Sequence, residues 1–382
     1  VAAVNGDYFD MNNSTAPVGT NISPSQGVRT LAPDTRPAFT IADGLAAVQA
    51  LTSAATVTID GTTHDVTGVN SPTIGTGGIG WYTPAWGTHT LARPLGAPAT
   101  VVTPMTKVTV ADGVVTEVST DPASVDGDAA IAEGTGVLIG REAGAATLAM
   151  LEVGDTVDVT VSASADVDLA VSGSQRLTID GEQTDADQVE ASRTAIGVNR
   201  DGTEITVVTI DGRAGDSRGM TLRELGDLML DLNVHNAVNL DGGGSTMLAV
   251  REPGDTDASI HNRPSDGSER VVANSLAFFS TAETGVVSDV RVAPALDVTD
   301  ADAVFPGLQR TVSGTGVDDN LTGVAVAGSF SASTDAAVRV ASSTEASAQL
   351  EGLTPGTATV SFTAEGKTAS TQLRVLGELE RI

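Results

Sequence analysis

The sequence predicts an α+β protein that is mostly β, with few helices. Short Val- and Thr-rich runs recur along the 382 residues and are bounded by Gly, Asp and Pro, which is the pattern of strands joined by turns. Aromatic residues make up only 3% of the chain, so the apolar core must consist mostly of Val, Ala, Leu and Ile. One segment in the second half has clear helical spacing, and the remainder favours strands.

The first two hundred residues contain turn signals between these runs. Asp43-Gly44 and Asp60-Gly61 separate Val/Thr-rich segments, and Asp112-Gly113 separates 107–110 from 114–118. Asp-Gly between two alternating runs favours a hairpin with a primed turn. We expect residues 100–190 to continue as strands, with an inserted β subdomain as one interpretation.

Residues 205–240 predict a strand, a helix and a second strand. The β-branched run Ile205–Ile210 is long enough for a buried strand. Thr221 and Glu224 form a capping box, and Asn233 can end the helix in the left-handed conformation. Ala237–Leu240 is the second strand. The helix is expected from apolar residues at helical spacing: Leu222, Leu225, Leu228, Met229 and Leu232.

Residues 286–382 change in character. They lack a helix signal and repeat short Val/Thr/Ser runs. The segment Leu353–Val360 reads as a turn followed by an alternating strand and resembles the closing part of bacterial Ig-like domains. We therefore expect an Ig-like β-sandwich over 286–382. Its role is that of a spacer or, alternatively, of a module that binds cell-wall glycan.

Composition restricts the partners. The chain has 49 acidic and 20 basic residues, a net charge of −29, which disfavours nucleic acid and anionic membranes. It has no cysteine, so disulfides, thiolate nucleophiles and Cys-ligated zinc are excluded. No run of 18 apolar residues predicts a membrane span. No signal peptide is visible, but the chain opens inside a predicted strand, so we expect that upstream sequence is missing.

The segment 239–246 is the strongest candidate for chemistry. Three glycines after a buried strand let backbone N–H groups approach an anion, because no Cβ blocks them. Asp241 stands at the strand end, where a carboxylate can face a cleft. The alternative is a tight turn whose Asp side chain bonds the loop. The candidate anion ligands of this loop are Gly242, Gly243, Gly244, Ser245 and Thr246.

Two further segments concentrate arginine and carboxylate groups. Asp211 and Arg213 follow the predicted strand 205–210. The loop 262–270 contains two arginines, Arg263 and Arg270, and guanidinium matches phosphate bidentately. In a chain with few basic residues these arginines are candidate oxyanion ligands. Surface salt bridges within the loop are the alternative.

Two segments hold most of the aromatic residues of the first hundred positions. In 4–10, Asn5 and Asp10 are candidates to line a site. Trp81 and Trp86 are the two tryptophans of the chain, and they are interpreted either as a sugar platform or as core aromatics.

The order of these segments resembles the phosphodiester glycosidase domain of the N-acetylglucosamine-1-phosphodiester α-N-acetylglucosaminidase family. The resemblance covers about residues 1–282 and is densest over 193–279. The stretch Ser172–Arg176 departs from the Gly-Gly-x-Pro that relatives often show, which puts the shape of the substrate pocket in doubt. The resemblance rests on Val-Asn-Gly-Asp-Tyr-Phe-Asp (4–10), Tyr-Thr-Pro-Ala-Trp-Gly (82–87), Arg-Thr-Ala-Ile-Gly-Val (193–198), Asp-Gly-Arg (211–213), Gly-Met-Thr-Leu (219–222), Asn-Leu-Asp-Gly-Gly-Gly-Ser (239–245) and Asn-Arg-Pro (262–264).

The resemblance implies a hydrolase that cleaves the glycosidic C–O bond of a sugar-1-phosphodiester. Asp241 and Asp211 are then the expected nucleophile or base, and Glu269 is a reserve acid or base. The phosphate or sugar would contact the 242–246 loop and a set of further residues: Asn5, Arg193, Arg213, Asn262 and Arg263.

The resemblance also implies a bacterial protein that is secreted or at the cell surface, acting on a phosphodiester-linked glycan. No cofactor is certain, and a divalent cation, Ca or Mg, stays open. Two other functions also stay open: a phosphodiesterase that cuts the P–O bond, and a non-catalytic protein that binds glycan or cell wall.

Overall fold

The computed structural model forms two compact units. The larger unit contains Ala3–Leu248 and Ile260–Ala277, and the smaller contains Val1–Ala2, Ala249–Ser259 and Phe278–Ile382. Most described residues lie in strands or loops, and the described part has two α-helices, so the expected mostly-β class is confirmed. The structure describes residues 1–184, 188–213, 215, 217–255, 257–296, 298, 300–333 and 337–377.

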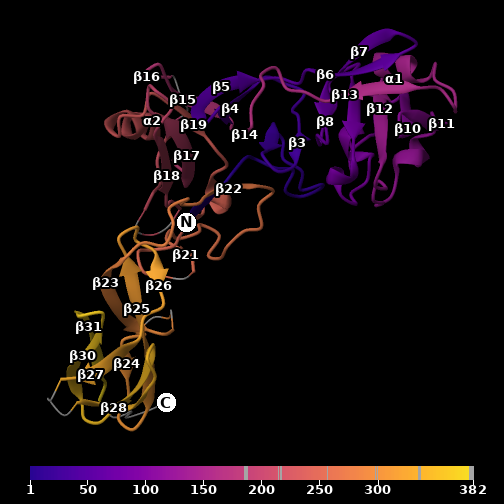
Figure 1. The fold of residues 1–382 in the computed structure, drawn as a ribbon. Helices are drawn as coiled ribbons and strands as arrows, with labels where there is room; N and C mark the ends of the chain where they lie inside the picture. Colours follow the sequence, from indigo (N-terminus) through magenta and orange to yellow (C-terminus); the bar gives the residue numbers. More distant parts are fainter. Residues whose placement is uncertain are drawn as a thin grey trace. The chain divides into compact units, whose positions relative to one another are not determined.

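A five-stranded sheet in the larger unit carries the segments that the sequence singled out. Helix α2 (Leu222–Asp231) lies against this sheet (Figure 1), and its apolar face packs with the strands in one core cluster. The run 205–210 forms the strand predicted for it, but β18 pairs only with β17 and is therefore a half-buried edge strand rather than a buried one. In sheet order the strands are β16 (Glu182–Gln183), β15 (Gln175–Ile179), β19 (Asn236–Asn239), β17 (Arg193–Val198) and β18 (Ile205–Ile210).

Helix α2 begins and ends at the residues that the sequence indicated. The Thr221 hydroxyl accepts a hydrogen bond from the Glu224 amide at 3.1 Å, and the Glu224 carboxylate accepts one from the Thr221 amide at 2.9 Å. Asn233 follows the helix with φ of 60°. The chain then returns through β19 to the centre of the sheet, so Asp241 is placed at the end of a buried strand.

Three Asp-Gly hairpins shape the N-terminal half. Asp43, Asp60 and Asp112 have φ near 50° and each precedes a glycine with positive φ, as primed turns require. They join three antiparallel pairs: β4 (Arg36–Ala42) with β5 (Leu45–Leu51), β6 (Ala55–Ile59) with β7 (Thr62–Val66), and β10 (Met105–Ala111) with β11 (Val114–Ser119).

The hairpin β10–β11 belongs to a sheet that starts before residue 100. Its order is β11-β10-β12-β9-β8, and its core cluster includes residues of β6 and of the short helix α1. The sheet thus extends beyond the expected β subdomain at 100–190 on its N-terminal side. The remaining elements are β8 (Gly68–Val69), β9 (Ile79–Tyr82), β12 (Thr135–Arg141), α1 (Ala143–Leu148) and β13 (Val157–Thr160), which pairs with β6.

A second five-stranded sheet of the larger unit, β3-β2-β14-β4-β5, includes the β4–β5 hairpin. Its other strands are β3 (Gly27–Thr30), β2 (Asn21–Ser23) and β14 (Leu169–Ser172).

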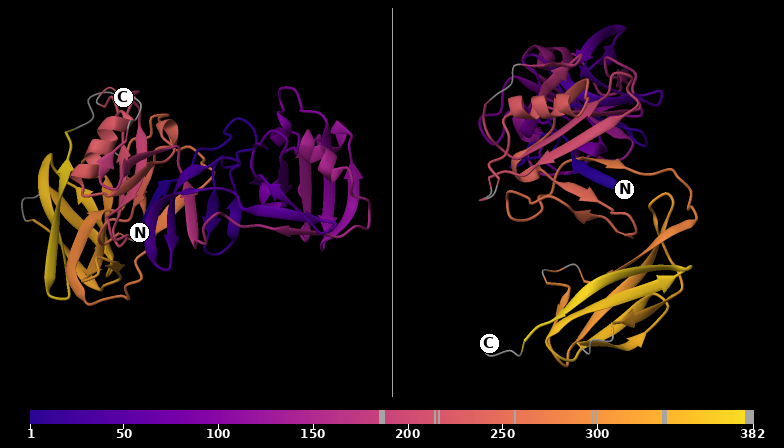
Figure 2. Two further views of the ribbon diagram at one scale, coloured as in Figure 1. Left: turned by 90° about the horizontal axis from the view of Figure 1, so that it is seen from above. Right: turned by 90° about the vertical axis from the view of Figure 1, so that its left-hand side faces the viewer.

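The smaller unit is built mainly from two sheets that share one apolar core (Figure 2). Phe362 lies at the centre of this core and contacts Phe330 at a ring-centroid distance of 4.7 Å. Strand β30 alternates buried and exposed residues from Ala358 onward, as predicted. The sheets are β23 (Val287–Pro294), β25 (Gln309–Asp318), β29 (Ser347–Gly352) and β28 (Val338–Ser343); and β24 (Ala303–Val304), β31 (Lys367–Val375), β30 (Gly356–Ala364) and β27 (Gly328–Ala332).

Among the described residues, no helix combines the length and the apolar character that crossing a membrane requires.

Candidate active site

Asn5 joins three distant stretches of chain at the candidate site. It ends strand β1 (Ala2–Asn5) and is 2% exposed. Its side-chain amide donates to the carbonyl of Asp241 at 2.7 Å, and its side-chain oxygen accepts from the Thr194 hydroxyl at 2.7 Å and the Met247 amide at 3.1 Å. Asn5 therefore lies at the site as expected, but these bonds give its side chain a structural task.

Replacing Asn5 by Ala should lower the free energy of unfolding by about 2 kcal/mol, because buried groups of Asp241, Thr194 and Met247 lose their partner. Urea unfolding followed by fluorescence measures this change. Asn21→Ala is the matched control, because the Asn21 side chain has no hydrogen bond within the described residues, and its effect should stay within about 0.5 kcal/mol. Equal losses in both variants would contradict this role of Asn5.

Asp241 presents a half-buried carboxylate directly after strand β19. One of its oxygens accepts from the Gly242 amide at 2.9 Å. Burial raises the pKa of Asp241, and a hydrogen bond from Ser245, the Gly242 amide and the charge of Arg270 oppose the rise. The Asp241 carboxylate is therefore partly exposed, so that a ligand can contact it, and partly shielded from water by the protein.

The glycine loop is a tight turn, and most of its amides donate within the protein. The Gly243 amide donates to the Ser192 carbonyl at 2.9 Å, and the amides of Ser245 and Thr246 donate back to Gly242 and Gly243 at 3.2 Å each. A Cβ on Gly242 would lie 2.6 Å from the Ser192 oxygen, so only glycine fits there. The amides of Gly242, Gly243, Ser245 and Thr246 are therefore bonded within the protein, and close approach explains the glycines at 242 and 244.

Two guanidinium groups lie beside this turn instead. Arg270 donates to the Ser245 hydroxyl at 3.3 Å and pairs with Asp266, its Nε lying 2.9 Å from the carboxylate. A Cβ on Gly244 would lie 2.2 Å from Nη2 of Arg270. Nη1 of the exposed Arg213 lies 3.7 Å from the position of a Cβ on Gly243. The positive charge needed for an oxyanion is therefore supplied at the turn by side chains.

Asp211 and Asn262 connect the neighbouring loops. The Asp211 carboxylate accepts from the Arg263 amide at 3.0 Å and the Asn262 side chain at 3.2 Å. The Asn262 oxygen accepts from the Leu248 amide at 2.7 Å. Asp211 and Asn262 are thus occupied in holding the 262–270 loop beside the turn. Glu269 is exposed and lines a separate open pocket with Pro264 and Asn262.

Arg193 is buried, and its guanidinium is used by the backbone. It donates to the Met220 carbonyl at 3.0 Å and to the Val189 carbonyl at 2.5 Å. Its charge still acts on the site, because it lowers the pKa of Tyr8 against the rise that burial causes. The Arg263 side chain is exposed, as is that of Arg213, but among the described residues it is Arg213 and Arg270 that lie near the turn.

Asp7 is the acidic residue of this site that sequence reasoning missed. It is 1% exposed, and its Oδ2 has no hydrogen-bond partner among the described residues. Burial raises the pKa of Asp7 to about 7; the positive charge of Arg36 opposes the rise and the negative charge of Asp241 adds to it. A Cβ on Gly19 would lie 2.2 Å from this oxygen, so the carboxyl group packs against backbone.

Asp10, which the sequence did single out, is occupied elsewhere. Its two oxygens accept from Arg93 at 2.7 and 2.9 Å, and this pairing, together with bonds from Ser14 and Asn13, holds its pKa well below the usual range despite burial. Asp10 is therefore an ion-paired structural residue. Trp86, 5% exposed, packs edge-on against Tyr82 and is a core aromatic rather than a sugar platform.

Asn239, Tyr8 and Ser174 form a polar cluster near Asp241. The buried Asn239 side chain donates to the Tyr8 hydroxyl and the Ser174 hydroxyl, both at 3.0 Å. Burial raises the pKa of Tyr8, and the charge of Asp241 contributes to the rise. Ser174 lies in the stretch 172–176 that departs from the family pattern, so this departure is located at the site.

The described residues do not identify a metal centre. No group of three or more His, Asp or Glu side chains in them is arranged to hold a metal ion. The acidic residues near the turn are bonded to amides or to arginine, as Asp211 and Asp266 are.

Comparison with known proteins gives matches over part of the chain. Residues 104–279 match the family model described as phosphodiester glycosidase. An SPbeta prophage-derived protein of Bacillus subtilis, YomE, is 40% identical over 88 residues, which is 23% of this chain and 13% of that protein. N-acetylglucosamine-1-phosphodiester alpha-N-acetylglucosaminidase of Bos taurus is 39% identical over 62 residues, 16% of this chain and 11% of the enzyme. The chain thus matches only a small share of these relatives.

Two solved structures share the fold. A hypothetical protein from Synechocystis superposes with a TM-score of 0.58 at 25% identity, covering 71% of this chain and 50% of that one. A protein of Burkholderia pseudomallei, provisionally described as exported, superposes with a TM-score of 0.55 at 23% identity, covering 72% of this chain and 65% of that one.

Proposed function

We propose, from the match of residues 104–279 to the phosphodiester glycosidase family model, that the protein hydrolyses the glycosidic C–O bond of a sugar-1-phosphodiester. The products are a free sugar and a phosphomonoester. The observation that carries the proposal is the half-buried carboxylate of Asp241, which lies beside the buried acid Asp7 and a turn contacted by Arg213 and Arg270.

The chemistry suits this set of groups. The departing phosphomonoester has a second pKa of about 6, so it leaves without strong help from a general acid. Its growing charge and the oxocarbenium-like sugar must be stabilised instead. In the proposal, Arg213 and Arg270 bind the phosphoryl oxygens, and Asp241 acts at the anomeric carbon as nucleophile or as the base for water.

Asp7 serves in this proposal as a positioning residue. With a pKa of about 7 it is largely protonated below neutral pH, so it adds little negative charge behind Asp241. A neutral Asp7 removes a negative charge that would otherwise disfavour ionisation of Asp241, and a nucleophile or base requires the ionised form. Asp211, which accepts from the backbone of Arg263, is assigned to loop positioning, and the exposed Glu269 is not needed.

The proposed setting is outside the cytoplasm. An acidic chain without cysteine is compatible with export, and the fold is shared with the Burkholderia protein described above. The substrate would be a phosphodiester-linked glycan of a cell surface. We propose that the two-sheet part of the smaller unit, expected to be Ig-like, is a spacer or a wall-binding module.

Hydrolysis in oxygen-18 water tests which bond breaks. A sugar-1-phosphate esterified to a simple alcohol is incubated with the protein, and both products are analysed by mass spectrometry. We expect the label in the anomeric hydroxyl of the sugar, because the oxygen of water becomes bonded to the anomeric carbon when the C–O bond breaks. Label in the phosphate would establish a P–O-cleaving phosphodiesterase, and the absence of turnover across a panel of such diesters would favour a non-catalytic binder.

A further inference from the structure

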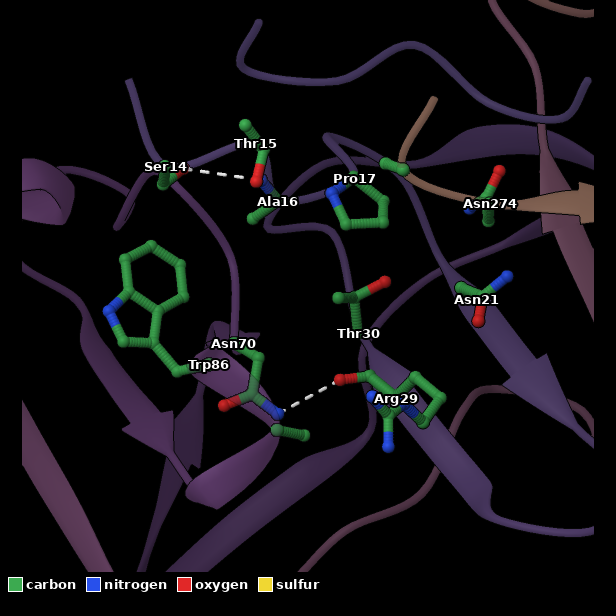
Figure 3. Close-up of a pocket in the computed structure, with 12 residues that line it drawn as sticks. Ser14, Thr15, Ala16, Pro17, Asn21, Arg29, Thr30, Asn70, Trp86 and Asn274 are labelled. Carbon is green, nitrogen blue, oxygen red and sulfur yellow. Dashed lines mark hydrogen bonds between the residues drawn. The ribbon is translucent and has the colours of Figure 1, made fainter. Parts of the chain in front are cut away.

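A second pocket in the larger unit has a composition unlike the rest of the chain. It lies between the 14–17 loop, strands β2 and β3, the 3-10 turn η1 (Pro84–Trp86) and Asn274 (Figure 3). Its volume is about 190 Å³ and it is partly enclosed, so it suits a ligand about the size of one sugar unit rather than an extended chain. Trp86 and Asn274 stand on opposite sides of it.

The charge of this pocket indicates what it binds. The chain has 49 acidic residues, yet none of them lines the pocket, and Arg29 is its only charged side chain. Arg29 is half-buried, and in the described part of the chain no carboxylate or carbonyl accepts from its guanidinium. The acid next to the pocket, Asp10, is already paired with Arg93. A guanidinium kept unpaired in so acidic a chain favours an anionic ligand.

The walls hold Arg29 in place before any ligand arrives. The Asn70 side chain donates to the Arg29 carbonyl at 2.9 Å and to the Thr83 hydroxyl at 3.0 Å, and it accepts from the Thr83 amide at 2.8 Å. The Trp86 indole donates to the His89 carbonyl at 2.8 Å, which fixes its ring. Such preorganisation lowers the entropy lost on binding.

Two amide side chains leave hydrogen-bonding capacity in the same pocket. The Asn21 side chain makes no hydrogen bond with a described residue. Asn274 uses its oxygen for the Asp7 amide at 2.8 Å, and its buried Nδ2 has no partner within the described residues. Amides of this kind recognise hydroxyl groups, and Nδ2 is also a donor for an oxyanion.

From these contacts we infer that the pocket binds an oxyanion carried on a hydroxyl-bearing ring, a sugar phosphate or a uronate. Arg29 pairs with the oxyanion, and Asn21 and Asn274 bond the ring hydroxyls. Because Asn274 also bonds the backbone of Asp7, the pocket adjoins the candidate active site. If the proposed function holds, its occupant is a neighbouring charged unit of the same glycan, and the substrate class is an anionic glycan.

Tryptophan fluorescence of the full chain measures this binding directly. Trp81 packs in a different core cluster, so Trp81→Phe leaves Trp86 as the reporter in the pocket wall. Glucose 6-phosphate, glucuronate, inorganic phosphate and glucose are titrated separately. We expect glucose 6-phosphate or glucuronate to bind at least tenfold more tightly than glucose and than inorganic phosphate. The charged sugar that binds more tightly shows whether the pocket prefers a phosphate or a carboxylate.

Variants show which residues contact the ligand. Arg29→Gln in the same background should weaken binding at least tenfold, and Arg29→Lys should restore part of it, with thermal unfolding unchanged in both. Arg213→Gln and Asp241→Asn should bind as the parent does. The inference is overturned if no charged sugar binds at millimolar concentration, if Arg29→Gln has no effect, if phosphate alone binds as tightly, or if Arg213→Gln abolishes binding. Arg29-dependent binding in a protein without turnover would refute only the proposed function.

Discussion

Asp241→Asn is expected to lower the rate of sugar-1-phosphodiester hydrolysis by on the order of 10³-fold or more, with the fold unchanged. The substitution keeps the size of the side chain and an oxygen that can accept from the Gly242 amide, so the turn should persist. It removes the negative charge that acts at the anomeric carbon in the proposed mechanism. Release of free sugar by the purified variant measures the rate, and its circular dichroism and thermal unfolding show whether the fold is unchanged.

Two other carboxylates of the same loops serve as controls. Glu269→Gln should leave the rate nearly unchanged, because Glu269 is exposed and its side chain makes no hydrogen bond with the turn in the described part of the chain. Asp211→Asn should reduce the rate far less than Asp241→Asn, because Asp211 holds the Arg263 amide rather than the substrate. Full activity of Asp241→Asn, or a large loss in Glu269→Gln, would reverse the assignment.

Asp7→Asn is expected to change the free energy of unfolding more favourably at pH 8 than at pH 4. The difference between the two changes should be up to about 4 kcal/mol. The folded protein holds the pKa of Asp7 at about 7, above the value of 3.8 for an unperturbed Asp. Between these pH values the folded state binds a proton that the unfolded state has released. The free energy of unfolding of the unaltered protein therefore falls as pH rises from about 4 to 7, and the variant escapes this fall.

Urea unfolding at several pH values tests this sign. Asp10→Asn is the matched control, because the pKa of Asp10 is held low by Arg93, Ser14 and Asn13. The stability that Asp10 contributes is present above the unfolded pKa and lost as pH falls, so its removal should destabilise the protein at neutral pH. A pH-independent difference between Asp7→Asn and the unaltered protein would show that Asp7 ionises normally.

Local signals predicted the local structure well. The capping box of Thr221 and Glu224 and the turn at Asp112-Gly113 depend on residues within a few positions of one another, and both formed as expected. The strand 205–210 was predicted as buried, because a β-branched run looks alike at the centre and at the edge of a sheet. Pairing partners decide that difference, and they are not encoded within the run.

The candidate site could be predicted only in outline. Asp7 and Asp10 stand in the same short segment, and Arg93, 83 residues away, determines that Asp10 is ion-paired while Asp7 is not. Likewise, the amides of a glycine turn can bond either a ligand or the protein. Here the Gly243 amide bonds the Ser192 carbonyl, which lies far away in the sequence. Such choices depend on residues brought together from distant positions, which spacing along one sequence does not reveal.

The bond between Asn5 and Asp241 spans 236 positions of sequence. Closing a loop of this length costs entropy that only a nearly complete set of native contacts can offset. The catalytic geometry should therefore form late in folding and disappear with the first global opening, rather than survive in a partly folded state. A fragment limited to residues 104–279 would keep the turn, Arg213 and Arg270. It would lack Asn5, whose side chain bonds the Asp241 carbonyl.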